Sequence, residues 1–123
     1  MNKAYLFILT IVFSIVFTNC NKNKYCYIKI NTPTDNQTFD SGALITIDAT
    51  IYDDGDAIMG ERLIVTSIPA NDTIINFAED KFTFEYLINK SFTGSTNTQY
   101  KIEIKAYGGH GNWASKSVNI TCN

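Results

Sequence analysis

Hydrophobic and polar residues follow two different patterns along this 123-residue chain. Residues 4–17 are almost wholly apolar, whereas apolar side chains from Tyr25 onward recur at every second position. Alternation of this kind places one face of a strand against a core and the other face in water. No stretch after the apolar segment sustains a helical period. The sequence therefore predicts an apolar N-terminal segment followed by a β-sheet domain.

The alternating part of the chain predicts about seven β-strands. Turn residues, mainly Gly, Asp, Asn, Ser and Pro, separate these segments about every 8–12 residues, which is typical of an all-β fold built as an antiparallel β-sandwich. The predicted strands span residues 27–31, 44–51, 62–68, 73–77, 82–88, 100–106 and 118–121.

The apolar N-terminal segment has the features of an export signal. Lys3 is its one charged residue and precedes the apolar run over residues 4–17, as in a secretory signal peptide. As a helix this run would be about 21 Å long, which is shorter than the ~30 Å hydrocarbon core of a bilayer. We therefore expect a signal helix, with a permanent single-span anchor as the alternative.

A cysteine stands shortly after the apolar segment. Phe17-Thr18-Asn19-Cys20 is followed by the polar Asn21-Lys22-Asn23-Lys24. This arrangement resembles the lipobox of bacterial lipoproteins, in the relaxed form found in Bacteroidetes-type bacteria. The resemblance implies that the Cys20 thiol is acylated and that Cys20 becomes the first residue of the mature chain. The chain then divides into a lipoprotein signal peptide (1–19), a short tether (20–24) and a β-sandwich (25–123).

The implied lipid anchor places the protein in a bacterial cell envelope. Acyl chains supply about 0.8 kcal/mol of membrane affinity per buried CH₂, so anchoring needs no basic patch. We expect the outer membrane rather than the inner one. The sequence leaves open whether the domain faces the periplasm or the cell exterior.

Charge and cysteine content exclude several classes of protein. The whole chain has a net charge of −2 and a pI of about 5.2. Because Lys3 leaves with the signal peptide, residues 20–123 carry 12 acidic and 9 basic side chains. This balance provides no electrostatic footprint for nucleic acid. Three cysteines are too few for a disulfide scaffold and lack the spacing of a zinc site.

Both ends of the β-rich part resemble bacterial immunoglobulin-like domains. Residues 31–39 contain a Thr-Pro turn and a phenylalanine, and are followed by Ser41-Gly42 and the isoleucine-rich strand 44–51. Residues 100–106 and 111–118 resemble the final hairpin of these domains, with Gly-Asn followed by small residues and a valine. The resemblance covers nearly all of the chain after the leader and implies an immunoglobulin-like sandwich.

Three core positions follow from that topology. Tyr100 begins the penultimate strand, and its hydroxyl either bonds to upstream backbone, as in a tyrosine corner, or reaches water. Cys26 and Cys122 share the inward phase of their strands but belong at opposite ends of the sandwich, about 30 Å apart. A disulfide needs Cα atoms within about 7 Å. We therefore expect two buried thiols.

Two polar groups are candidate sites of chemistry. The Asp53, Asp54 and Asp56 carboxylates could ligate Ca²⁺, but the EF-hand pattern is absent and an ordinary solvated turn explains them. His110 is the only histidine and has no nucleophile or paired carboxylate at catalytic spacing. The sequence thus predicts no enzyme, no cofactor and, the weak aspartate candidates aside, no metal site.

Trp113 is the strongest candidate for a binding residue. Together with His110 and Asn112 it belongs to the last hairpin loop, which this topology places beside the loop at residues 53–56. Such a rim could bind a ligand, because Trp is enriched at interfaces. Alternatively, Trp113 packs over the open end of the core. The short tether would hold this rim near the membrane.

One modification motif is present. Asp72-Thr73-Ile74 resembles the O-glycosylation acceptor of Bacteroidetes-type periplasmic proteins, which implies Thr73 as the acceptor.

The sequence supports three functional hypotheses. The first is a membrane-anchored, non-enzymatic lipoprotein that binds or scaffolds another envelope component. The second is a module that binds glycan or cell-wall material through the rim around Trp113, by stacking of sugar rings on the indole. The third, a small enzyme, lacks paired catalytic groups.

Overall fold

The computed structural model describes residues 26–53, 55, 57–109, 111 and 113–123. The predicted signal helix, the tether with Cys20, and four loop positions named above (Asp54, Asp56, His110 and Asn112) lie outside the described residues.

The described part of the chain forms eight β-strands and no helix. None of its elements is therefore a helix long and apolar enough to cross a bilayer. The strands are β1 (Cys26–Thr32), β2 (Gln37–Phe39), β3 (Leu44–Asp53), β4 (Ile58–Ile68), β5 (Thr73–Glu79), β6 (Glu85–Thr93), β7 (Thr98–Gly108) and β8 (Trp113–Cys122).

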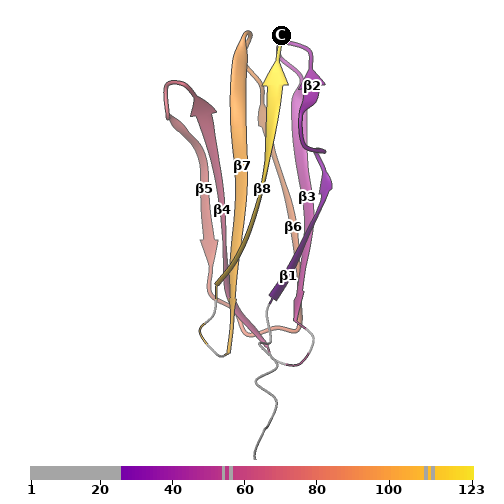
Figure 1. Ribbon diagram of the computed structural model, residues 1–123, viewed down its shortest axis with the longest axis vertical. Coiled ribbons are helices and arrows are strands. Elements are labelled where there is room, and N and C mark those ends of the chain that lie inside the picture. The colour runs from indigo at the N-terminus through magenta and orange to yellow at the C-terminus, as the bar shows by residue number, and fades with distance from the viewer. Residues whose placement is uncertain (1–25, 54, 56, 110, 112) are drawn as a thin grey trace, which may run out of the picture.

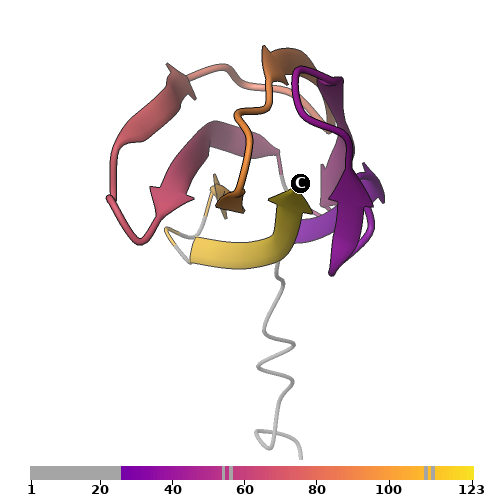
Figure 2. The same ribbon diagram turned by 90° about the horizontal axis from the view of Figure 1, so that it is seen from above.

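The strands form two sheets that face each other across one core. One sheet has the order β1-β3-β6 and the other the order β2-β8-β7-β4-β5. All pairings are antiparallel except that of β2 with β8, which is parallel. Figures 1 and 2 show the two layers from the side and from above.

The long axis of the sandwich gives it two ends. At the N-terminal end, β1 begins and the β3–β4, β5–β6 and β7–β8 connections lie; the chain finishes at the opposite, C-terminal end (Figure 1). The inward positions of the alternating strands form the core between the sheets. Its fully buried aliphatic side chains are Ile45, Ile47, Ile51, Ile58, Leu63, Val65, Ile102 and Ile104.

The structure confirms the predicted sandwich and adds one strand to it. β2 was missed because it has only three residues and pairs along just the last three residues of β8, from Ile120 to Cys122. β4 and β8 also begin earlier than the alternation suggested.

The predicted strand 82–88 was wrong at its start. Its phase placed Phe82 and Phe84 in the core, yet both side chains are about two-thirds exposed, at 68% and 65%. β6 begins only at Glu85, so these two residues lie in the connection beyond the end of the core. Tyr86 and Ile88 keep the predicted inward phase.

Tyr100 forms the bond to upstream backbone that defines a tyrosine corner. The Ser95 amide donates to the Tyr100 hydroxyl over 2.8 Å, and the ring packs edge-on against Phe92 at a centroid distance of 5.0 Å. Tyr100 is 2% exposed, so the alternative of a hydroxyl in water is wrong.

Cys26 and Cys122 are both buried, and no disulfide joins them. Cys26 begins β1, where its thiol donates to Asp53 Oδ2 over 3.5 Å. Cys122 ends β8 at the opposite end, against Gly94 and Ile45. Burial raises the pKa of the Cys122 thiol, which keeps it protonated and poorly reactive.

Candidate functional site

Trp113 lies on the outer face of the five-stranded sheet, not over the open end of the core. It begins β8, where the inward positions are Val118, Ile120 and Cys122, so the odd-numbered residues point outward. The indole is 53% exposed. It packs against the ring of Tyr107, its partner in β7, with centroids 4.5 Å apart.

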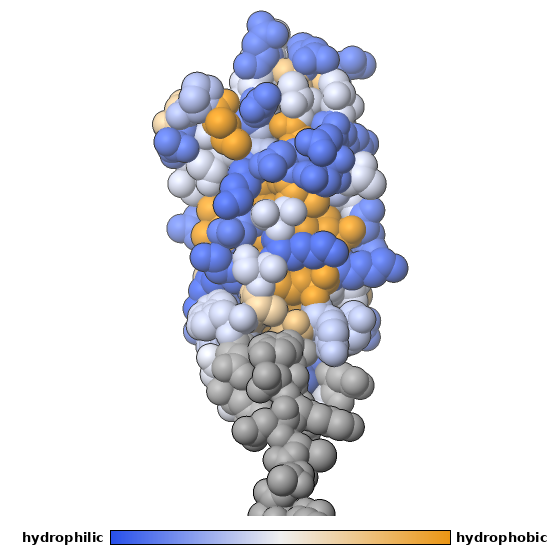
Figure 3. All heavy atoms as spheres, viewed as in Figure 1, coloured by the Kyte–Doolittle hydropathy of each residue, from blue (hydrophilic) through white to orange (hydrophobic). Residues whose placement is uncertain are grey.

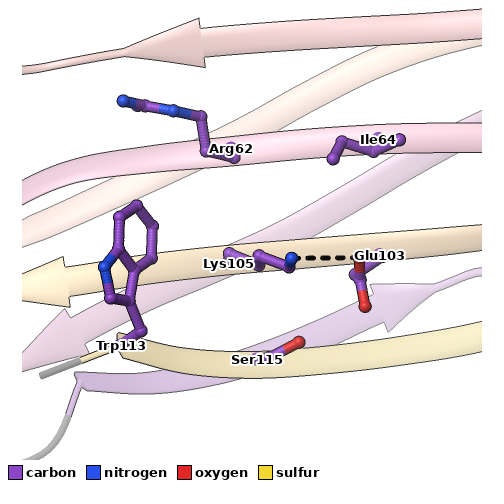
Figure 4. A pocket seen from close by; sticks show the side chains of 6 residues that line it. All are labelled: Arg62, Ile64, Glu103, Lys105, Trp113 and Ser115. Atoms are coloured by element: carbon purple, nitrogen blue, oxygen red, sulfur yellow. Dashed lines mark ion pairs between the residues drawn. The ribbon is translucent and has the colours of Figure 1, made fainter.

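An open groove of about 640 Å³ runs along this outer face from Trp113. Figure 4 shows the indole reaching from β8 across β7 toward β4. The groove is lined by Arg62 and Ile64 of β4, Glu103 and Lys105 of β7, and Trp113 and Ser115 of β8.

Both signs of charge line the groove, and each charge has a partner. The Arg62 guanidinium pairs with Asp80 at 2.9 Å and lies 5.9 Å from the centre of the Trp113 ring. Lys105 pairs with Glu103 at 3.6 Å, and Lys101 pairs with the same carboxylate at 3.5 Å. These pairs are partly exposed and individually weak. The groove thus offers donors, acceptors and an aromatic surface without a strong net charge.

Gly60 allows the tight packing at the Trp113 end of the groove. A Cβ at this position would stand 2.5 Å from both Asp80 Oδ1 and Tyr107 Cε1. Without it, the Tyr107 hydroxyl donates to Asp80 over 3.3 Å, and the same carboxylate oxygen accepts from Arg62. The β4–β7 register shifts between Ile58 and Gly60. Asp80 therefore orients both the guanidinium and the ring that supports the indole.

Behind the groove, the core contains a carboxyl group. Glu61 is on the inward phase of β4 and is fully buried, and neither of its oxygens accepts a hydrogen bond from any residue that the structure describes. Burial raises the pKa of Glu61 to about 7, and Glu79 adds to the rise. The neighbouring Tyr86 hydroxyl, Lys81 and Arg62 offset part of it. Glu61 therefore changes its charge near neutral pH.

Tyr86 and Glu79, which are both partly buried, complete an acidic cluster with Glu61. The Tyr86 hydroxyl, from the opposite sheet, donates to Glu79 Oε2. Burial, followed by the contacts with Glu61 and Glu79, raises the pKa of Tyr86 above its usual value, so the hydroxyl stays neutral. Two carboxyl groups and one phenol thus meet at the N-terminal end of the core.

The structure brings together the loops that were expected to form a rim. The Gly109 amide donates to Ala57 O over 3.1 Å, which joins the β7–β8 and β3–β4 connections. Asp53 Oδ1 accepts from the Gly55 amide over 3.0 Å, the geometry of an ordinary turn. Among the residues described, no group of three or more His, Cys, Asp or Glu side chains could hold a metal ion.

Thr73 lies far from the groove. It is the exposed first residue of β5, at the C-terminal end of the sandwich.

Most of the groove and all of the acidic cluster were not predicted from the sequence. The outward phase of Trp113 and Ser115 was available from the alternation of β8. To predict that Arg62 and Lys105 lie beside them, one needs the register between strands, which only the structure supplies. Glu61 was detectable by extending the inward phase of Val65 and Leu63 two residues further back.

The fold is similar to that of several proteins of known structure. No family model matches the chain, and no curated protein matches its sequence. The structure is similar to fibronectin(III)-like modules of Clostridium thermocellum CbhA, with a TM-score of 0.52 and 18% identity over 79% of this chain and 97% of that one.

Two further matches come from proteins of quite different kinds. One belongs to the complex of zinc 2-glycoprotein with prolactin inducible protein from human seminal plasma (TM-score 0.57, 8% identity, 85% of this chain and 100% of that one). The other is a superoxide reductase from Ignicoccus hospitalis (TM-score 0.55, 9% identity, 81% of this chain and 82% of that one). At these identities the likeness shows the fold alone. The chain is an immunoglobulin-like, fibronectin-III-like β-sandwich.

Proposed function

We propose that the protein is a non-enzymatic lipoprotein of the bacterial cell envelope, anchored through acylated Cys20, that binds another envelope component with its immunoglobulin-like domain. The groove beside Trp113 supports a binding role most directly. It combines an exposed indole, a supporting tyrosine and side chains of both charges on a rigid sheet. Exposed Trp and Arg are the residue types that contribute most to protein interfaces.

Anchoring and binding are tested separately. Fractionation of cells that express the native chain or Cys20→Ser tests the anchor, and we expect the native chain in the membrane fraction and the variant released from it. For binding, purified native chain and Trp113→Ala are used to capture envelope proteins under identical conditions. Loss of one captured partner with Trp113→Ala, but not with the exposed control Leu44→Ala, supports the proposal. Equal capture by all three chains contradicts it.

A neutral glycan is the second candidate ligand. Trp113 and Tyr107 form an exposed aromatic surface, and Arg62, Glu103 and Ser115 offer hydrogen-bond donors and acceptors beside it. Sugar rings pack on aromatic faces, while their hydroxyls bond to such groups. Because Trp113 is the only tryptophan, its fluorescence reports binding directly. Titration with envelope polysaccharides should shift that emission, and an unchanged emission would favour a protein partner.

A further inference from the structure

The three-stranded sheet and the connection that leads into β6 carry an exposed apolar corner. Five of the nine large hydrophobic side chains exposed in the described part of the chain gather there, at the N-terminal end. We define the aromatic corner as Tyr27, Tyr52, Phe82, Phe84 and Leu87.

Ring contacts join four of these side chains in two pairs. Tyr27 stacks on Tyr52, its partner across β1 and β3, with ring centroids 5.2 Å apart. Tyr52 lies opposite Glu85, the first residue of β6. Phe82 and Phe84 lie in the connection just before β6, with their rings edge-on and their centroids 6.0 Å apart. Leu87 follows on the same outer face of β6, opposite Thr50. Two aromatic pairs and Leu87 are therefore exposed at the same end of the sandwich.

Exposure of these apolar side chains to water is unfavourable. Phe82, Phe84 and Leu87 expose about two-thirds of their side-chain area, and grouped apolar exposure of this kind marks an interaction site. The opposite end is different: Figure 3 shows it covered largely by hydrophilic residues on the face in view. Five of the exposed large hydrophobic side chains thus lie where the chain enters the domain.

We propose that the aromatic corner docks on the lipid bilayer, so that the domain lies against the membrane on this corner; the inference rests on the proposed anchoring at Cys20. Only residues 21–25 separate Cys20 from β1, and five extended residues span at most about 17 Å. The corner is therefore within reach of the surface that holds the acyl chains. Tyr and other amphipathic aromatic side chains favour the headgroup region of a bilayer.

The charges that border the corner identify the kind of lipid. Glu85 lies opposite Tyr52, Lys29 lies in the same cross-strand row as Leu87, and Lys81 precedes Phe82. These groups, one negative and two positive, leave only a small net charge. Docking should accordingly occur on zwitterionic phospholipid, with little dependence on salt or on anionic lipid.

The docked corner leaves the groove accessible. Trp113 belongs to the other sheet and its side chain points away from the three-stranded one. Docking on the corner tilts the domain so that the groove of the five-stranded sheet faces away from the lipid. The bilayer and the envelope ligand then use different faces of the same domain.

Tryptophan quenching tests this orientation. The full chain, processed in a bacterial host, is placed in phosphatidylcholine vesicles that contain brominated acyl chains. In the Trp113→Phe background, Phe84→Trp supplies one indole in the corner, while the native chain supplies one in the groove. We expect stronger quenching for Phe84→Trp than for native Trp113, and at least a twofold loss of that quenching when Phe82→Ser and Tyr52→Ser are added.

Flotation of the vesicles separates failure of this inference from failure of the anchor. If the native chain floats with the vesicles but Phe84→Trp is not quenched, docking is wrong and the anchor stands. If the chain neither floats nor is quenched, both are wrong. The exposed pair Leu44→Ser with Ile74→Ser, at the opposite end, is the matched control and should leave the quenching unchanged. A detergent-solubilised dimer that Phe82→Ser and Phe84→Ser dissociate would overturn docking in favour of a second copy of the chain.

Discussion

The two ends of the core each bury a polar side chain, but only one of these has its hydrogen bond. Near the C-terminal end, the Tyr100 hydroxyl accepts from the Ser95 amide and the ring packs on Phe92. Near the N-terminal end, the Glu61 carboxyl is fully buried and has no hydrogen-bond partner among the described residues. A satisfied buried group stabilises a fold, whereas an unsatisfied one costs free energy.

The surroundings of these two polar groups differ less. Beside Glu61 lie a register shift, a glycine in close contact with side chains, and the groove with Trp113. Near Tyr100, the β4–β5 register also shifts, between Val65 and Thr66, and Gly94 is likewise in close contact with side chains. The two ends therefore differ mainly in the hydrogen bonding of the buried polar group and in the groove, which shares the N-terminal end with Glu61.

The largest test of this contrast concerns pH and Glu61. Its pKa in the folded chain is raised to about 7 from an ordinary 4.5. The protonated side chain therefore makes its full contribution to the free energy of unfolding below pH 4.5, and this contribution is lost as the pH rises through 7. The loss amounts to about 3 kcal/mol. Urea unfolding at pH 4 and pH 8 should show this decline in the native chain. Glu61→Gln, which cannot ionise, should lack it, and parallel pH curves for the two chains would contradict the assignment.

The next test removes the satisfied group. Tyr100→Phe keeps the ring but leaves the Ser95 amide without its acceptor, so we expect a loss of about 1–2 kcal/mol in the free energy of unfolding at every pH. Tyr86→Phe is the matched variant at the other end. Because it also removes a hydroxyl beside Glu61, it should raise the Glu61 pKa and move the pH dependence to higher pH, which Tyr100→Phe should not do.

A smaller effect is expected at Gly60. In Gly60→Ala the new methyl group collides with Tyr107 and Asp80, so we expect a loss of about 1 kcal/mol and a shift in Trp113 emission as the supporting ring moves. A methyl group on Gly109 would meet nothing within 4 Å. Gly109→Ala should therefore change neither quantity, and an equal response of both variants would exclude the packing explanation.

The smallest effect concerns the ion pair at the groove. Asp80→Asn weakens the pair with Arg62, in which the Asp80 side chain is 64% exposed. Such pairs contribute about 0.5 kcal/mol or less. Thermal unfolding should hardly change. Ligand binding and Trp113 emission should change instead, because Asp80 orients the guanidinium near the indole.

The sequence predicted what depends on one strand at a time. Alternation identified the long strands and their inward residues, and it made Tyr100 a candidate for a tyrosine corner without deciding between that bond and a hydroxyl in water. Alternation gave the wrong prediction at Phe82 and Phe84. The alternating pattern of β6 extends back to these residues in the sequence, but they lie beyond the end of the core. The groove was also beyond reach, since Arg62, Lys105 and Trp113 meet only through the register of three strands.

The short parallel pairing of β2 with β8 has a mechanical consequence. Hydrogen bonds from Asn36 N to Asn119 O and from Asn123 N to Phe39 O, of 2.7 and 3.0 Å, flank this pairing. Under the proposed anchoring, a pull on the C-terminus is resisted through the segment that enters the fold at the opposite end. Because β2 and β8 run in the same direction, that force shears their bonds together instead of opening them one by one. Tension between the membrane and the C-terminus thus falls first on a few bonds placed side by side.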